Sequence, residues 1–296
     1  MADYLLRGIS KDKNFRFFVV NAKETVQKAI DIHYLSIINS VVLGRLLISG
    51  LLMSADLKNE KDILTLRIDG DGPVGCVLVT ATGKNTVKGY VQNPQTELPL
   101  KNKQFQVAEA IGKGTLSVIR SIGDLQPYIG HINLQSREIA QDISHYYYQS
   151  EQIETIINLG ILIEPDAKIR QAGGVFVQCL PNTPEDKLSI LKNNIDKLPN
   201  LSDFMDMGKD LENILKNHIF KDIEIEFSSQ KDVSYKCNCD KERFYNGIKL
   251  LGEQEIQDLI ESDETISAEC HFCNQRYEFS KEELISMLNK KEDSHE

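Results

Sequence analysis

Two short stretches near the C-terminus, Cys237-Asn238-Cys239 and Cys270-His271-Phe272-Cys273, decide how the last part of the chain folds. They lie 30 residues apart and hold four of the six cysteines. Four thiolates in two close pairs are typical of a tetrahedral zinc site, in which each Zn–S bond is about 2.3 Å long. The sequence therefore predicts one Zn²⁺ per chain with four thiolate ligands: Cys237, Cys239, Cys270 and Cys273.

Two other kinds of metal site fit the sequence less well. His271 could replace a cysteine as ligand, but the cysteines on both sides of it offer better geometry. A catalytic zinc keeps an open coordination position, usually beside a base in a motif such as H-x-E or H-E-x-x-H. Neither motif occurs in the sequence. A closed site of four thiolates is therefore favoured over a hydrolase or deaminase centre.

The same thiolates suggest a stability switch. A domain of about 60 residues is marginal alone, and a structural zinc can contribute an apparent ~10–16 kcal/mol to its folding. A disulfide that closes a loop of three or four residues contributes only about 2 kcal/mol on the chain-entropy estimate. Exchanging the metal for short-loop disulfides is a net loss, so we expect oxidation to unfold this domain.

Length and composition indicate a globular protein of 296 residues, 41% hydrophobic and 26% charged. The first residues lack a basic segment followed by an apolar run, as a secretory signal would have. The most apolar stretch, Val41 to Met53, is shorter than the roughly 20 residues of a membrane span, which predicts a buried helix and no membrane association. We therefore expect a cytoplasmic protein, in a compartment where thiols are kept reduced.

Charge and missing motifs exclude several functions. Residues 231–296 contain 9 basic and 16 acidic side chains, and residues 181–230 contain 6 and 10. This acidity argues against nucleic-acid binding, which needs basic surface. The phosphate-binding motif G-x-x-x-x-G-K-[ST] and the nucleophile motif G-x-S-x-G are both missing from the sequence. We expect no nucleotide, no nucleic-acid partner and no enzymatic activity.

Residues 1–180 predict an α+β domain with an antiparallel sheet packed against helices. A long helix is expected from about Glu24 to Ser54, and a further helical segment over residues 136–158. Short segments separated by Gly, Asn and Asp predict strands joined by turns. The expected strands are Arg16–Asn21, Ile63–Ile68, Val74–Thr80, Thr86–Val91, Thr115–Arg120, Tyr128–Leu134 and Gly174–Leu180.

The remaining chain divides into two parts. Residues 181–230 contain amphipathic helices and the alternating run Ile223 to Phe227, which predicts a linker whose order depends on what it docks against. An ordinary helical extension of the first domain is the alternative. Residues 231–296 predict a small zinc-binding domain, with a hairpin over Glu269–Phe279 and a last helix that opens on a capping box at Ser280 and Glu283.

The spacing of the cysteines resembles that of the 33 kDa chaperonin family, the redox-regulated heat-shock chaperones. Other stretches agree in the same order along essentially the whole chain: Arg67–Pro73, Gly89–Pro94, Tyr148–Ile153, and Gln171–Gly174 leading to Leu180-Pro181. The resemblance implies an ATP-independent holdase that is inactive when reduced and zinc-bound. It also implies binding of unfolded client proteins and a homodimer when oxidised.

The resemblance further implies which disulfides form. Four cysteines allow three pairings on the residues alone. By resemblance, oxidation joins Cys237 to Cys239 and Cys270 to Cys273, releases zinc and exposes a client-binding surface. Two other functions remain open on the residues: a constitutive zinc-ribbon adaptor that binds a protein partner, and a thiol–disulfide oxidoreductase. The oxidoreductase would need its C-x-x-C at a helix N-terminus after a strand.

Overall fold

The computed structural model describes residues 2–198, 200–262 and 266–292, which form two compact units, Met1–Lys236 and Cys237–Glu296. Within these residues the first unit contains an α+β fold, as predicted. Its strands are β1 (Tyr4–Ser10), β2 (Phe15–Asn21), β3 (Ile63–Gly70), β4 (Val77–Thr82), β5 (Thr86–Val91), β6 (Gly114–Ser121), β7 (Tyr128–Asn133), β8 (Thr155–Ile163), β9 (Ile169–Cys179), β10 (Ile225–Asp232) and β11 (Ser234–Tyr235).

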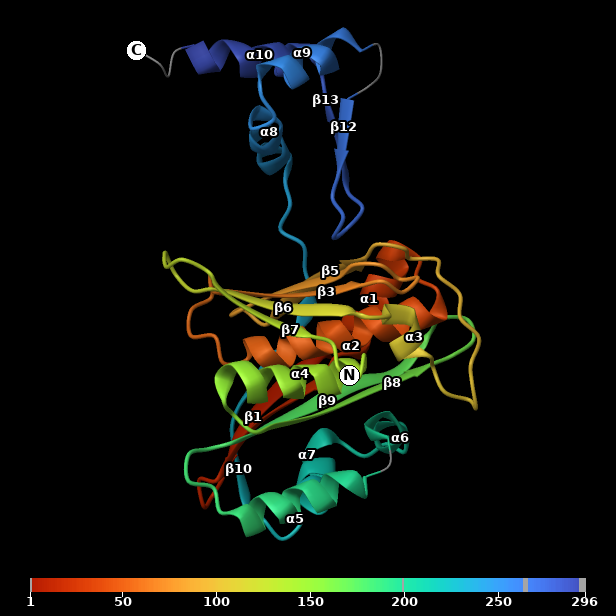
Figure 1. The fold of residues 1–296 in the computed structure, drawn as a ribbon, viewed down its shortest axis with the longest axis vertical. Helices are drawn as coiled ribbons and strands as arrows, with labels where there is room; N and C mark the ends of the chain where they lie inside the picture. The colour runs from red at the N-terminus through yellow and green to blue at the C-terminus, as the bar shows by residue number, and fades with distance from the viewer. Residues whose placement is uncertain (1, 199, 263–265, 293–296) are drawn as a thin grey trace. The chain divides into compact units, whose positions relative to one another are not determined.

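Two sheets enclose the helices of residues 23–146 (Figure 1). One has the strand order β10-β1-β2-β9-β8, and the other has the order β11-β5-β4-β3-β6-β7. All neighbours pair antiparallel except β11, which pairs parallel with β5. The helices are α1 (Lys23–His33), α2 (Ile37–Ser54), α3 (Val107–Ile111) and α4 (Ile139–Tyr146), followed by a π-helical turn η1 (Tyr147–Glu151).

Helix α2 lies between the two sheets and contacts strands of both. By length and composition alone this helix could span a membrane, but 89% of it is buried inside the unit. A helix that is apolar on every side belongs in a core. The prediction of a buried helix over this segment is therefore confirmed.

The predicted single helix from Glu24 to Ser54 is wrong, because the chain breaks into α1 and α2. Tyr34 adopts a left-handed conformation with φ 51°, which ends α1. Ser36 then caps α2 by accepting a hydrogen bond from the backbone N–H of Asn39. A serine N-cap satisfies one of the open N–H groups of a new helix. The apolar periodicity continues through this corner because both helices face the same core.

A second prediction, a helix over residues 136–158, is correct only to Glu151. Gln152 has φ 56° and closes the π-helical turn, and strand β8 begins at Thr155. The run Ile156 to Ile163 is rich in β-branched residues that pair with β9. Strand β1 was not predicted, and β4 begins three residues later than expected, at Val77.

Gly174 in β9 lets α2 approach the sheet closely. A Cβ atom placed on Gly174 would lie 2.6 Å from Cγ2 of Ile48 in α2. Real Cβ contacts are never that short. Gly174 is therefore a packing residue.

The predicted linker packs on the outer face of the first sheet. Its helices α5 (Glu185–Asp196), α6 (Leu201–Asp206), α7 (Leu211–Ile214) and the π-helical turn η2 (Leu215–Ile219) lie beneath that sheet (Figure 1). Together with the strands they bury a second apolar core, which is separate from the core around α2. Its buried members from the strands are Leu6, Phe15, Phe17, Val19, Val175 and Val177, and those from the linker include Leu191, Leu201, Leu211, Ile214, Leu215, Ile219 and Phe220.

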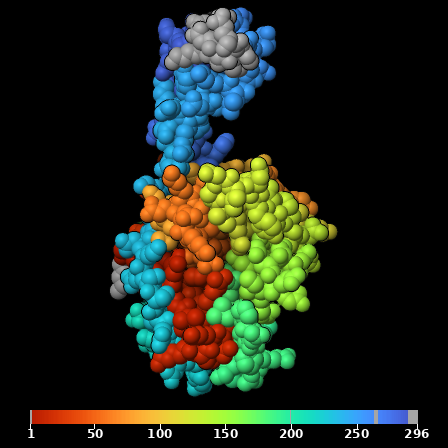
Figure 2. All heavy atoms as spheres, turned by 90° about the vertical axis from the view of Figure 1, so that its left-hand side faces the viewer, coloured from red at the N-terminus to blue at the C-terminus, as the bar shows by residue number. Residues whose placement is uncertain are grey.

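The end of the linker is held in both sheets. Strand β10 pairs with β1, and Figure 2 shows β10 in cyan beside the red β1. Strand β11 then adds Tyr235 to the second sheet, where its buried hydroxyl donates to the carbonyl of Gly89 at 2.9 Å and lies 3.2 Å from Nε2 of His33. By contacts, residues 181–236 therefore group with the first unit. The division into a core domain (residues 1–180), a linker (181–230) and a zinc-binding domain (231–296) remains a prediction.

The described part of the second unit is small. It contains α8 (Lys241–Lys249), α9 (Glu253–Glu261), the hairpin β12 (Ile266–Glu269) and β13 (Arg276–Phe279), and α10 (Lys281–Glu292). Four large apolar side chains are fully buried among its described residues: Ile256, Phe279, Leu284 and Met287. Few buried apolar groups mean little hydrophobic stabilisation, so this unit needs another source of stability.

Candidate metal centre

Each pair of cysteines lies where the backbone bends. The strand before the first pair ends at Tyr235, so Cys237 and Cys239 lie in a loop. Asp240 follows them and caps α8 by accepting a hydrogen bond from the backbone N–H of Arg243 at 2.8 Å. This cap fixes the backbone where the loop ends after Cys239 and α8 begins.

The second pair occupies the turn of the β12–β13 hairpin. The backbone N–H of Cys273 donates to the carbonyl of Cys270 at 3.2 Å, and Asn274 donates to the same carbonyl at 2.8 Å. Asn274 has φ 55°, a conformation that Asn tolerates better than most residues. The tight turn directs both sulfurs to one side, as the predicted hairpin requires.

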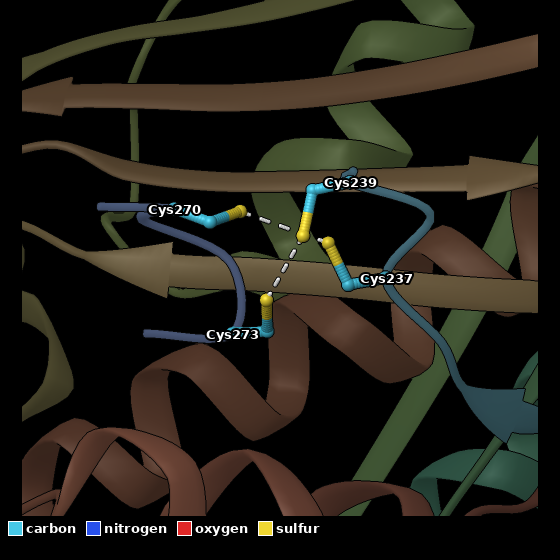
Figure 3. A group of neighbouring side chains, drawn as sticks. All are labelled: Cys237, Cys239, Cys270 and Cys273. Atoms are coloured by element: carbon cyan, nitrogen blue, oxygen red, sulfur yellow. Dashed lines mark hydrogen bonds between the residues drawn. The ribbon is translucent and has the colours of Figure 1, made fainter. Parts of the chain in front are cut away.

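The four sulfur atoms converge on one point (Figure 3). All lie within 4.8 Å of one another, with 3.7 Å between Cys237 and Cys270 and 3.3 Å between Cys239 and Cys273. A tetrahedral site with Zn–S bonds of about 2.3 Å has sulfurs about 3.8 Å apart. The arrangement therefore fits a single tetrahedral metal ion. His271 is not a member of this group of four.

Tyr277 is a neighbour of the site that sequence reasoning missed. Its hydroxyl donates a hydrogen bond to Sγ of Cys239 at 3.3 Å, and its ring packs on Phe244 with centroids 5.0 Å apart. Its position in a strand four residues after Cys273 was the available signal. Hydrogen bonds to ligand sulfurs orient them and tune their basicity.

The thiols affect one another's ionisation. Burial raises the pKa of Cys239, but hydrogen bonds from Tyr277 and the other sulfurs outweigh it and lower that pKa to about 7. Burial and the neighbouring sulfurs raise the pKa of Cys273. When two groups share a site in this way, the first proton leaves easily and the second with difficulty. The cluster therefore favours the thiolate form of Cys239 near neutral pH.

The capping box predicted for the last helix is confirmed. The backbone N–H of Ser280 donates to the carboxylate of Glu283 at 2.9 Å, and the backbone N–H of Glu283 donates to Oγ of Ser280 at 3.2 Å. The same carboxylate accepts from Nζ of Lys241 at 2.7 Å. These contacts connect the starts of α8 and α10, which follow the two halves of the cysteine cluster.

The two remaining thiols lie apart from the cluster. The apolar, strand-like sequence around Cys76 and around Cys179 predicts buried small hydrophobic residues. Both are half-buried, so this prediction is only partly correct. Burial and the nearby carboxylate of Glu154 raise the pKa of Cys179 to about 11. Neither thiol belongs to the metal-binding group.

We expect Cys179 to resist alkylation in the folded protein. With a pKa of about 11, only about one thiol in a thousand is ionised at pH 8, and the thiolate is the nucleophile. Iodoacetamide treatment followed by mass spectrometry measures the modified fraction. Protein unfolded in guanidinium chloride is the control, in which Cys179 should react readily. Equal rates in folded and unfolded protein would contradict the expectation.

Comparison with known proteins identifies the family. The sequence model described as Hsp33 protein matches residues 3–280. The chain belongs to the Hsp33 family. Hsp33 relatives named 33 kDa chaperonin include those of Lactobacillus johnsonii, 39% identical over 98% of this chain and 99% of the relative, and of Acetivibrio thermocellus, 37% identical over 97% of both.

A solved Hsp33 structure has the same fold. The crystal structure of the 33 kDa chaperonin from Thermotoga maritima superposes with a TM-score of 0.91 at 35% identity, covering 99% of this chain and 100% of that one. Hsp33 proteins are chaperones and not enzymes, so the chain is a chaperone that binds client proteins. The resemblance drawn from the cysteine spacing is confirmed.

The structure also weighs against an oxidoreductase. Such an enzyme places its C-x-x-C at a helix N-terminus, where the helix dipole stabilises a thiolate. Here Cys270 and Cys273 lie in a hairpin turn between β12 and β13. Their sulfurs are instead shared with the other pair in one metal-binding group.

Proposed function

We propose that the chain is a redox-regulated, ATP-independent holdase that protects unfolding proteins from aggregation under oxidative stress. One observation carries the proposal: four thiols in a single cluster organise a unit that has a very small apolar core. Chemistry at those sulfurs therefore decides whether the unit is folded. Family membership supports chaperone activity as the result of that decision.

The four sulfurs would hold one zinc ion when reduced. A bound zinc supplies folding energy to the unit, about 10–16 kcal/mol in small zinc domains. Thiolate ligands suit zinc over hard cations such as Mg²⁺ or Ca²⁺, which prefer oxygen. All four ligands come from protein, which leaves no open position for catalysis.

Oxidation removes these ligands. Two thiols and one molecule of hydrogen peroxide give one disulfide and two molecules of water, so each pair of sulfurs loses two electrons to the oxidant. Both bonds together consume two molecules of peroxide. A disulfide sulfur carries no thiolate charge and binds metal poorly. The unit then loses a contribution that two short-loop disulfides, about 2 kcal/mol each, do not replace.

We assign the disulfides to Cys237–Cys239 and Cys270–Cys273. In the reduced cluster all four sulfurs are close, and the sulfur–sulfur contacts of 3.7 Å and 3.3 Å each join one cysteine of the first pair to one of the second. Once the unit unfolds, only cysteines close in sequence stay near each other. Thiol–disulfide exchange then favours bonds within each pair, because closing a short loop costs less entropy.

Unfolding of the metal-binding residues would spread to the linker. Tyr235 lies two residues before Cys237, and β11 is only two residues long. Short elements at the end of a folded unit open at low free-energy cost. Loss of β11 and then of the linker, residues 181–230, would expose the apolar face of β1, β2 and β9 that Phe220 and its neighbours cover. That exposed face would hold unfolding clients.

The remaining parts of the proposal follow from this surface. Two molecules with uncovered apolar faces associate readily, which accounts for a homodimer in the oxidised state. An exposed surface needs no nucleotide to bind clients. A cytoplasmic location fits a switch that is held reduced until stress arrives.

A single experiment tests the proposal. The reduced, metal-loaded chain is treated with hydrogen peroxide while a colorimetric chelator records zinc release and light scattering records aggregation of a thermally unfolding client. We expect both signals to change together, and dithiothreitol with zinc to reverse them. Zinc that stays bound, or a client protected equally before and after peroxide, would contradict the switch; the first outcome would favour a constitutive adaptor.

A further inference from the structure

The β6–β7 hairpin exposes a concentrated set of apolar side chains. Among the described residues, 13 large hydrophobic side chains are exposed, and four of them fall within eight residues of this hairpin: Ile122, Leu125, Tyr128 and Ile129. Leu125 is 73% exposed and Ile129 is 52% exposed. Figure 2 shows the hairpin in yellow-green on the face turned to the viewer. Grouped apolar exposure of this kind marks an interaction site more often than single exposed residues do.

Strand β7 is also an unprotected sheet edge. It is the outermost strand of its sheet and pairs only with β6 among the described strands. Its sequence, Tyr128-Ile129-Gly130-His131-Ile132-Asn133, contains no Lys, Asp, Glu or Pro. Natural proteins normally protect such edges with charges, prolines or very short strands, because open N–H and C=O groups accept another strand.

Two of the other three edges of the two large sheets are protected by charges or by shortness. Strand β10 carries Glu226, Lys231 and Asp232, and β11 is only two residues long. Strand β8 has no charged residue, but it packs against α4 and α6. Among the described edge strands of the two large sheets, β7 combines an uncharged edge with large exposed apolar side chains, Tyr128 and Ile129.

A basic groove lies at the C-terminal end of β7. It has a volume of about 510 Å³ and is lined by Lys113 and Arg137 together with Thr115, Asn133 and Gln135, and by no carboxylate. Neither cation has an ion-pair partner among the residues that the structure describes. The nearby carboxylate of Asp71 accepts the backbone N–H of Lys113 at 2.6 Å. In a chain of net charge −10, this groove attracts anionic groups.

We propose that the edge of β7 binds an extended client segment as an added strand, with apolar residues along the hairpin and acidic residues at the basic groove. Backbone pairing suits a holdase because unfolded clients share no sequence but all have a backbone. The proposal rests on the proposed function and names its client class. The linker packs on the other large sheet and leaves this edge uncovered, while the holdase surface of the proposed function stays covered in the reduced protein.

A second copy of the chain fits the same edge less well. Two β7 strands paired antiparallel around a twofold axis would place Asn133 of each near Tyr128 of the other. The basic grooves would then lie at opposite ends, each without an anionic partner. Charge complementarity therefore favours an apolar segment with an acidic end.

The test uses three fluorescein-labelled peptides and the reduced, metal-loaded full chain. The first peptide alternates Val and Thr and ends in two Asp at both termini, so that either strand direction brings acid to the groove. The second has Lys in place of Asp. The third is the first with alternate backbone nitrogens methylated on its pairing edge. Anisotropy should show the acidic peptide binding about tenfold tighter than the lysine peptide at low salt, and the methylated one not binding.

Variants locate the site. Leu125→Ser with Ile129→Ser should weaken the acidic and lysine peptides alike, by about tenfold. Lys113→Gln with Arg137→Gln should remove the difference between them. The matched control combines Leu100→Ser, at an exposed leucine elsewhere in the first unit, with Lys28→Gln, and should bind as the unaltered chain does.

Several results would overturn the proposal: no peptide binding, equal binding of the methylated peptide, or variants that bind unchanged. Sedimentation of the chain without peptide tests whether a second copy occupies the edge. If the unaltered chain dimerises and the hairpin variant does not, the edge serves self-association instead. Peroxide-induced zinc release in the same variants separates this proposal from the switch. A hairpin variant that releases zinc normally but no longer binds the peptide supports the hairpin site. If the unaltered chain does not release zinc under peroxide, the proposed switch fails, and the peptide result is unaffected.

Discussion

Replacing Cys270 with serine is expected to unfold the second unit in the reduced protein. Cys270 is buried, and its sulfur lies 3.7 Å from that of Cys237. A serine hydroxyl does not ionise at neutral pH and cannot replace a thiolate ligand. Loss of the metal removes about 10–16 kcal/mol of apparent folding energy from a unit whose small core offers little to offset it.

Metal content and amide hydrogen exchange measure this effect. The variant should retain no zinc after dialysis, and amides of the second unit should exchange at rates of an unfolded chain, while those of α2 stay protected. Cys76→Ser is the matched control, because it removes a half-buried thiol of the first unit that is outside the cluster. A Cys270→Ser protein that kept its zinc and its protection would show that the remaining three thiols and another ligand suffice.

Replacing Phe220 with alanine is expected to activate the reduced protein without oxidation. Phe220 is 1% exposed, and its ring lies 5.0 Å from Phe17 and 6.3 Å from Phe15 on the covered sheet. Truncating a buried phenylalanine costs about 3–5 kcal/mol. Because that cost falls on the docking of the linker, the population with an uncovered apolar face should rise.

Client aggregation at a temperature where the unaltered reduced chain gives no protection measures the gain. The variant should suppress light scattering while its zinc content stays at one ion per chain. Met207→Ala is the matched control, since Met207 lies in the same linker but is 74% exposed. If Phe220→Ala loosens the linker by hydrogen exchange and yet gives no protection, the covered sheet is not the client surface.

The cluster was predictable from sequence because its chemistry is local. Two cysteines within three or four residues can reach one metal after a single tight turn, whatever the rest of the chain does. The hairpin at Cys270 and the capping box at Ser280 are equally local, and both occur as predicted. The position of Tyr277 four residues after Cys273 indicates only that it is near the site; its hydrogen bond to Cys239 depends on how β13 packs beside the other loop.

The errors lie where tertiary packing overrides a local pattern. The apolar periodicity of residues 24–54 continues across Tyr34 because α1 and α2 face one core, so the break between them was hidden. The helix predicted over residues 136–158 extends too far, because the β-branched residues after Gln152 pair with β9, the next strand along the chain.

The sequence by itself determined the family, the α+β class and the four cysteines of the candidate metal centre, because motifs and cysteine spacing are properties of short segments. Only the tertiary structure decided that α5, α6, α7 and η2 cover a sheet, that Tyr235 is held beside Gly89, and that β7 is an open edge beside a basic groove. These features depend on which distant segments meet. The free energy gained when two surfaces are buried against each other depends on both surfaces, so the sequence of one segment alone does not determine it.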